Sequence, residues 1–355
     1  MDIGSTCWSD KLTNVAQVGG IETSVLDNGA GRGLRIAWFN TGSGFRFKVV
    51  LDRAMDIADA FFNQHGLAWL SHLAATPPQP FSDKGADWLR TFGGGLITTC
   101  GLAHVGGPES DEFGERGVHG LISNLPAQIE SIIQPDPSRG LYEMSITGVI
   151  RETKIFGPSL ELRRTISATL GKSSLRLHDT VINRGNTAAP HMLLYHCNLG
   201  WPLAEEGSML LWKGKVLQKD DQGALVECNP PKEFKVCPAV QETHLGSGEE
   251  IAVVDMHTDS DGKTACGLYN PSLDLALVLR YAKAQLPWMT NWRHWAKGEY
   301  VTGLEPATHP PIGQKKARAE NSLIFIQPGE TKEYQLEIDL LNQKNDISSL
   351  LQSLT

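Results

Sequence analysis

Short segments in which apolar and polar residues alternate recur along the chain, with turn residues between them. Side chains of a β-strand point alternately to the two faces of its sheet, so this period of two predicts strands buried on one face. The clearest segments are GLRIAWFN (33–40), FRFKVVLD (45–52), LYEMSITGVIRE (141–152), LELRRTISATL (160–170), SLRLHDTVIN (174–183) and LALVLRYA (275–282). The pattern predicts an all-β fold, a large antiparallel β-sandwich or barrel, in one domain that spans residues 1–355.

The C-terminal part of the chain follows the same pattern. SLIFIQPGETKEYQLEIDLL (322–341) predicts two strands joined at Pro-Gly-Glu. Helical periodicity is rare and predicts helices only around 66–74 and 345–354. The sequence has no internal repeat of about 20 to 50 residues, which argues against a propeller.

Composition excludes several classes of function. The 355 residues carry a formal net charge of -8, whereas binding to nucleic-acid phosphates needs clustered Lys and Arg, so we expect no nucleic-acid partner. No apolar run approaches the roughly 18 residues of a membrane span, and the N-terminus MDIGSTCWSD lacks the features of a signal peptide. We therefore expect a cytoplasmic protein with no membrane partner, either a monomer or a homodimer.

Cysteine and glycine patterns argue against common cofactor sites. The six cysteines form no Cys-x-x-Cys pair, so neither a zinc knuckle nor a redox motif is present. A phosphate-binding loop of the Gly-x-x-x-x-Gly-Lys type is also absent. We interpret the glycines of FGGGLITTCG (92–101) as backbone positions, because positive φ angles and close packing are the commonest reasons for glycine.

The stretch HMLLYHCNLG (191–200) places two histidines in an apolar run. On an unbroken strand His196 shares a face with Leu194 and Asn198, whereas His191 lies on the opposite face. Ligands of one metal ion must converge, so this spacing disfavours a metal site and favours His191 as a buried structural residue. For His196, a proton-transfer role and a structural role both fit the spacing.

Three stretches, in order along the chain, resemble the aldose 1-epimerases, the galactose mutarotase-like family. The first is SLRLHDTVINRGNTAAPHMLLYHCNLGWPL (174–203), in which His196 takes the place of the family's catalytic histidine and Cys197 replaces an aromatic residue. GVHGLISNLPAQ (117–128) looks like the family's His-Gly segment and YVTGLEPATHPP (300–311) like its Glu-Pro segment. The resemblance implies a galactose mutarotase-like supersandwich, and LDRAMDI (51–57) looks more like an uncharacterised branch of that superfamily.

The resemblance implies a chemistry that the residue types suit. Interconversion of α and β anomers removes a proton from the C1 hydroxyl and delivers another to the ring oxygen. Glu305 would be the base and His196 the acid, kept protonated by a nearby carboxylate, while His119 would hold the ring or anomeric oxygen. This reaction needs no metal and no organic cofactor, and we expect neither. The implied partner is a small-molecule sugar.

Other residues are candidates for sugar binding. Arg53 and Asp56 offer a donor and an acceptor for hydroxyl groups, although a salt bridge at a strand end is an equal alternative. Asn198 belongs to the histidine motif. Trp288 and Trp292 can stack on pyranose rings, although a cluster of core tryptophans is the alternative.

The substrate and the activity stay open at this level. Arg293 and His294 can meet a phosphate if the sugar carries one. The family's sugar-binding aspartate has no convincing counterpart, since Asp255 is nearest in position but differs in context. Two alternatives remain beside the mutarotase: a non-catalytic sugar-binding protein on the same scaffold, and a metal-dependent sugar isomerase of a different β-barrel type that uses His191, His196 and another histidine as ligands.

Overall fold

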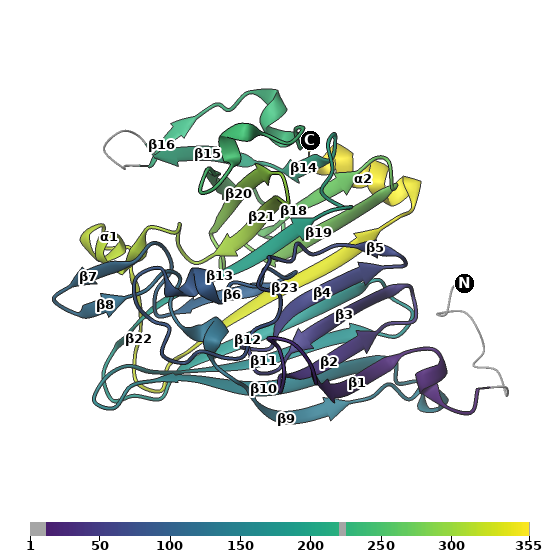
Figure 1. Cartoon of the computed structure of the whole chain (residues 1–355), viewed down its shortest axis with the longest axis horizontal. Coiled ribbons are helices and arrows are strands. Elements are labelled where there is room, and N and C mark those ends of the chain that lie inside the picture. Colours follow the sequence, from purple (N-terminus) through teal and green to yellow (C-terminus); the bar gives the residue numbers. More distant parts are fainter. Residues whose placement is uncertain (1–11, 220–224, 355) are drawn as a thin grey trace.

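Antiparallel strands make up most of the molecule and form three large sheets and one small hairpin (Figure 1). The computed structural model describes residues 12–219 and 225–354. The predicted all-β class is confirmed, and all six alternating segments contain strands. In the described part of the chain, no helix has the length and apolar character needed to cross a membrane.

The first sheet contains five consecutive strands in the order of the chain. They are β1 (Gly20–Val25), β2 (Arg35–Asn40), β3 (Phe45–Val50), β4 (Asp56–Phe62) and β5 (His65–Gly66). Phe39, Phe45 and Phe47 are fully buried, and the rings of Phe39 and Phe47 stack with centroids 4.6 Å apart. The apolar half of each alternating segment thus faces the interior.

The second sheet contains eight strands in the order β14-β18-β19-β23-β12-β11-β10-β9. Their bounds are β9 (Gln128–Ile133), β10 (Glu143–Thr153), β11 (Ser159–Thr169), β12 (Ser174–Asn183), β14 (Met209–Trp212), β18 (Lys263–Asn270), β19 (Leu275–Ala282) and β23 (Thr331–Leu341). Buried and more exposed residues alternate along β11, β12 and β23. Along these three strands, one face therefore packs on the core and the other is more exposed.

The third sheet has the order β16-β15-β17-β20-β21-β13-β22, and β6 pairs with β13 outside that path. Its strands are β6 (Thr98–Leu102), β13 (Ala189–Gly200), β15 (Gly214–Lys219), β16 (Leu225–Cys228), β17 (Glu250–Met256), β20 (Trp288–Ala296), β21 (Glu299–Ala307) and β22 (Ile324–Ile326). The separate hairpin consists of β7 (Glu109–Asp111) and β8 (Gly114–Arg116). β13 is buried on both faces along nearly its whole length.

Hydrophobic side chains from all three large sheets form one continuous core. Within it, the completely buried Arg164 donates to both carboxylate oxygens of Asp179, at 2.9 and 2.7 Å. Arg164 also donates to Asp56 on β4 (3.1 Å), and the Tyr195 hydroxyl on β13 donates to Asp179 (2.8 Å). This network joins one strand of the first sheet, two of the second and one of the third, so it ties the three sheets together.

Helices are short, and one of the two predicted helices is wrong. The C-terminal helix α2 (Lys344–Leu354) is confirmed and buries Ile347, Leu350 and Leu354. Residues 66–74 form no helix, because Ala68 and Leu70 make β-bridges to Leu199 and Gly94 instead. The remaining helices in the described chain are α1 (Gly313–Ala319) and the 3-10 turns η1 (Val15–Gln17), η2 (Asp87–Arg90), η3 (Ile122–Asn124), η4 (Pro137–Arg139), η5 (Lys232–Lys235) and η6 (Glu242–His244).

The two strands joined at Pro-Gly-Glu are present, but they do not pair with each other. β22 pairs with β13 in the third sheet, whereas β23 lies between β12 and β19 in the second. The turn therefore carries the chain from one sheet to the other. In Figure 1 the long strand β23 runs diagonally through the molecule and ends near α2.

Candidate active site

Neighbouring strands of the third sheet place three polar side chains in one row. Thr290 on β20 pairs with Glu305 on β21. On the other side of β21, the antiparallel register with β13 sets His196 opposite Glu305. The side chains of paired residues in one row point to the same face of a sheet, and here that face lines a pocket of about 1000 Å³.

His196 and Glu305 are in direct contact at the bottom of this pocket. The Nε2 atom of His196 lies 3.2 Å from the Oε1 atom of Glu305, and the two side chains are only 7% and 3% exposed. The opposite face of β13 presents Tyr195 to the buried arginine network, as the alternation predicted. Two of the predicted catalytic residues, more than 100 positions apart in the sequence, therefore form one buried pair.

His119, the third predicted catalytic residue, reaches the same pocket from a loop. Its backbone is left-handed, with φ of 55°, and its N–H donates to the carbonyl of Gly106 at 3.0 Å. The His119 ring packs edge-on against Trp88, with centroids 4.9 Å apart, and its centroid is 6.1 Å from that of His196. The fold thus brings all three residues together.

Three buried polar atoms of this pocket have neither a hydrogen-bond nor an ion-pair partner within the protein. They are Nδ1 of His119, Nδ1 of His196 and Oγ1 of Thr290. An unsatisfied buried polar atom costs free energy of folding, so such atoms are rare in native proteins outside functional sites. In a pocket, such atoms are available to form hydrogen bonds with a ligand.

Burial favours the neutral forms of these side chains. It lowers the pKa of His196 to about 4, and burial with repulsion from His196 and His104 lowers the pKa of His119 to about 3. Burial, followed by the nearby charge of Glu249, raises the pKa of Glu305 well above its ordinary value. The expectation that a carboxylate keeps His196 protonated is therefore wrong, because desolvation of the imidazolium outweighs that attraction.

Aromatic side chains form the walls around the pair. Trp292 on β20 and Phe92 lie with ring centroids 5.3 and 5.2 Å from that of His196. Trp69 packs edge-on against Trp292 at 6.2 Å. Sequence reasoning missed Trp69, because it lies in the segment that was predicted as a helix. Its backbone N–H donates to the carbonyl of Asn198, and this contact between distant segments leaves no local signal.

Gly303 is a second residue that the sequence did not single out. It pairs with Trp292 in the row next to Glu305. A Cβ atom at position 303 would lie 2.6 Å from Oε1 of Glu305 and 3.3 Å from two carbon atoms of Trp292. The missing side chain makes room for both the carboxylate and the indole, and the Gly before Leu304 in YVTGLEP is the only sequence signal for it.

Trp288 and Asn198 lie outside the lining of this pocket. Trp288 is half-buried at the start of β20 and pairs with Asp255, whose carboxylate accepts from Lys283 at 2.6 Å. Asn198 is fully buried, and its amide donates to the carbonyls of Gly95 and His196, both at 3.0 Å. Asn198 therefore holds the backbone that carries His196.

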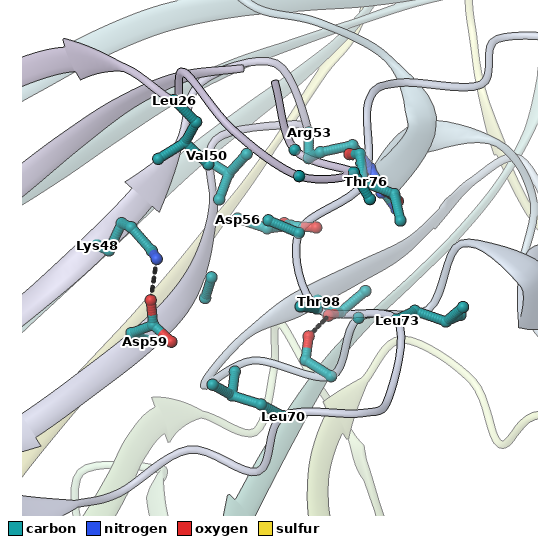
Figure 2. Close-up of a pocket in the computed structure, with 18 of the residues that line it drawn as sticks. Leu26, Lys48, Val50, Arg53, Asp56, Asp59, Leu70, Leu73, Thr76 and Thr98 are labelled. Carbon is teal, nitrogen blue, oxygen red and sulfur yellow. Dashed lines mark hydrogen bonds and ion pairs between the residues drawn. The ribbon is translucent and has the colours of Figure 1, made fainter. Parts of the chain in front are cut away.

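Arg53 and Asp56 line a different and smaller pocket of about 350 Å³, shown in Figure 2. Arg53 lies in a turn and donates to three backbone carbonyls and to Oγ1 of Thr76. Asp56 accepts from Thr99 and Arg164 and belongs to the buried network. Lys48 and Asp59 form an ion pair in the same view. Since these charged groups are already partnered, the smaller pocket offers less to a reacting ligand.

His191 occupies the opposite face of β13, as the alternation predicted. Its Nδ1 lies 2.9 Å from the carbonyl oxygen of Leu102 and its Nε2 lies 2.7 Å from the hydroxyl of Tyr334. Burial lowers its pKa to about 3. Within residues 12–219 and 225–354, no three His, Cys, Asp or Glu side chains converge as metal ligands.

Solved structures of other proteins share this architecture. A candidate aldose 1-epimerase from Klebsiella pneumoniae matches with a TM-score of 0.83 and 22% sequence identity, over 96% of this chain and 89% of that one. A galactose mutarotase-like protein from Clostridium acetobutylicum matches with a TM-score of 0.65 and 13% identity, over 91% of this chain and 98% of that one. At these identities the likeness establishes the fold, and the chain has the galactose mutarotase-like fold that its motifs predicted.

Sequence comparison gives a complementary result. No curated protein matches the chain. The family model described as a domain of unknown function, DUF4432, matches residues 31–340, which is most of the sequence. The chain therefore belongs to the DUF4432 family.

Proposed function

We propose that this protein interconverts the α and β anomers of an aldose by acid and base catalysis at His196 and Glu305. The observation that carries the proposal is the contact between these two side chains at the bottom of a pocket lined by aromatic rings. Imidazole and carboxyl groups are the usual agents of proton transfer in enzymes. Tryptophan and phenylalanine faces suit the C–H faces of a sugar ring.

The closeness of the two groups fits the geometry of the reaction. The hydroxyl oxygen that loses a proton and the ring oxygen that gains one are both bonded to C1. An acid and a base that serve them must therefore sit side by side, as His196 and Glu305 do at 3.2 Å. A pair on opposite sides of the sugar would suit a displacement at C1 instead.

The buried pair holds one labile proton and no net charge. With that proton on Glu305, the two roles are the reverse of those expected from the sequence. The imidazole of His196 removes the proton of the C1 hydroxyl while Glu305 protonates the ring oxygen. The C1–O5 bond breaks and C1 becomes a carbonyl carbon. Rotation about the C1–C2 bond and reversal of both transfers then closes the ring to the other anomer and restores the pair.

His119 is placed to bind the sugar rather than to transfer its protons. Its Nδ1 is buried and unpartnered, and the low pKa keeps the ring neutral, so one ring nitrogen donates and the other accepts. A neutral imidazole of this kind can hold the ring oxygen or the anomeric oxygen by a hydrogen bond. Thr290, with a free buried hydroxyl beside Glu305, offers a second contact.

The test is anomer exchange measured by saturation-transfer NMR across a panel of neutral aldoses. For a sugar whose exchange the wild type accelerates, we expect His196→Asn and Glu305→Gln to lose about 10²- to 10⁴-fold in kcat/KM while staying folded. The matched controls are His178→Asn and Glu333→Gln, which alter an exposed His and Glu 3.7 Å apart on the second sheet. These controls are expected to keep wild-type rates.

Two outcomes would overturn the proposal. If no aldose exchanges faster with the protein, or if both site variants match the wild type, the pair is not catalytic. Binding of a sugar without exchange would identify a carbohydrate-binding protein on this scaffold. Loss of exchange after dialysis against a chelator, restored by a transition metal, would identify the metal-dependent isomerase.

A further inference from the structure

The pocket extends well beyond the His196–Glu305 pair. Its volume of about 1000 Å³ is at the top of the range of roughly 300 to 1,000 Å³ that is typical of small-molecule sites. The pair lies deep, whereas Glu249 and Glu299, which also line the pocket, are exposed and half-buried. A single pyranose ring in contact with the pair therefore leaves the outer part of the pocket unfilled.

Two neighbouring aromatic rings, called here the Trp292–His294 surface, line the pocket beside the reactive pair. Trp292 and His294 are two residues apart on β20 and face the pocket together, with ring planes only 12° apart and centroids separated by 6.3 Å. Trp292 donates its indole N–H to Glu249 at 2.7 Å, and Nδ1 of His294 lies 2.6 Å from the carbonyl oxygen of Gly248. Both rings are thus held in place before any ligand arrives.

This surface continues directly from the reactive pair. The ring of His196 lies 5.3 Å from that of Trp292, and the ring of Trp292 lies 6.3 Å from that of His294. A sugar whose reducing ring contacts His196 and Glu305 would place its next ring over Trp292 and His294. Indole and imidazole faces suit the apolar face of a pyranose.

The charges around the pocket select against anions. The described residues that line it include three glutamates and no lysine or arginine. Arg293, adjacent to Trp292 in sequence, points to the other face of β20, where its guanidinium lies on the ring of Phe234 and pairs with Glu250. The phosphate contact considered for Arg293 is therefore wrong. Phosphate and carboxylate groups are normally bound by Arg, Lys or free backbone amides.

Two backbone amides at the start of helix α1, near the pocket, are not free to supply that missing donor set. Ile312, which precedes helix α1, lines the pocket. However, the N–H of Gly313 already donates to the carbonyl of Val105, and the N–H of Lys315 donates to the carboxylate of Glu109.

We infer that the substrate is an uncharged saccharide of at least two rings, with its reducing ring at His196 and Glu305 and its second ring on Trp292 and His294. The inference rests on the proposed function and adds the class of sugar. It excludes sugar phosphates and uronic acids as the preferred substrates. The Trp292–His294 surface then determines the affinity for the saccharide, while His196 and Glu305 determine the rate of anomer exchange.

The experiment compares matched sugars by saturation-transfer NMR. Glucose, galactose and mannose are each tested beside a disaccharide that carries the same sugar at its reducing end, and beside the corresponding 6-phosphate. For the best sugar we expect the disaccharide to have a KM about tenfold below that of the monosaccharide, as one stacked ring would give. The 6-phosphate is expected to show a kcat/KM at least about tenfold lower than the neutral monosaccharide.

Variants locate the second ring. His294→Ala is expected to raise the KM for the disaccharide about tenfold with little change in kcat, because it removes half of the surface but no reacting group. The control His257→Ala alters an exposed histidine outside the pocket and is expected to change neither constant.

The outcomes separate this inference from the proposed function. Exchange of monosaccharides with no advantage for any disaccharide, or with a preference for the 6-phosphate, would overturn the inference and leave the mutarotase proposal intact. An unchanged KM in His294→Ala would overturn the placement of the second ring. Absence of exchange with every sugar would overturn both.

Discussion

Gly303 leaves the space that the carboxylate of Glu305 occupies: a Cβ atom at position 303 would lie 2.6 Å from Oε1 of Glu305. The far end of a glutamate side chain moves more easily than backbone. We therefore expect Gly303→Ala to displace the carboxylate from His196 and to lower kcat/KM at least about tenfold, with a loss of stability of about 1 to 3 kcal/mol.

The control for this variant is Gly66→Ala, because the nearest atom to a Cβ at position 66 is at an ordinary 3.6 Å. Exchange rates and urea unfolding are measured for both proteins. Equal activity of Gly303→Ala and the wild type would show that the position of the Glu305 carboxylate does not control the reaction.

The pH dependence of the reaction follows from the single proton of the buried pair. Below about pH 4, the pKa of His196, the imidazole gains a second proton and can no longer act as a base. At high pH, Glu305 loses its proton once the pH exceeds its raised pKa, and the acid is lost. We expect a bell-shaped profile of kcat/KM with its acid limb near pH 4. An acid limb near the ordinary histidine value would contradict the neutral state of His196.

Arg164 is predicted to be essential for stability rather than for catalysis. Arg164→Met leaves Asp179 and Asp56 buried without their cationic partner, so we expect a loss of about 3 to 5 kcal/mol in the free energy of unfolding. The matched control is Arg163→Met, since Arg163 is half exposed and pairs with Glu130 on the surface. That change is expected to cost less than about 1 kcal/mol.

His191 is expected to make the fold sensitive to acid. Its pKa is about 3 in the folded protein and about 6.5 in the unfolded chain, so unfolding takes up a proton between these pH values. The stability from neutral His191 is therefore complete above pH 6.5 and declines as the pH falls, by up to about 1.4 kcal/mol per pH unit. Urea unfolding of the wild type and of His191→Gln at pH 7 and pH 5 checks this, because the variant should have a shallower pH slope. Equal slopes would show that His191 titrates normally.

Sequence patterns predicted strands such as β11, β12 and β23 well, because buried and more exposed residues alternate along them. The same alternation correctly placed His191 and His196 on opposite faces of β13. It failed at 66–74, where the spacing of apolar residues suits a helix but the backbone pairs with Leu199 and Gly94. Such pairing depends on segments far away in the sequence and has no local signature.

The site was only partly predictable for a similar reason. His119, His196 and Glu305 were identified through a resemblance to a family, and the fold brings them into one pocket. The guanidinium of Arg53 was a plausible sugar-binding group, but its N–H groups donate to nearby backbone carbonyls. The buried polar atoms without a hydrogen-bond partner, and the space that Gly303 leaves for Glu305 and Trp292, both result from packing in three dimensions. A local sequence pattern does not show such packing.

The interior and the edge of the third sheet have different consequences for how such a protein can diverge. The reacting groups lie on β13 and β21, in the interior of the sheet, where almost any change disturbs the core. The rim of the pocket is formed in part by Leu217, Gln218 and Leu225 from β15 and β16, at the edge. Substitution in that edge hairpin can change which ligands enter the pocket without altering the His196–Glu305 pair, so selectivity for ligands can evolve separately from the buried pair.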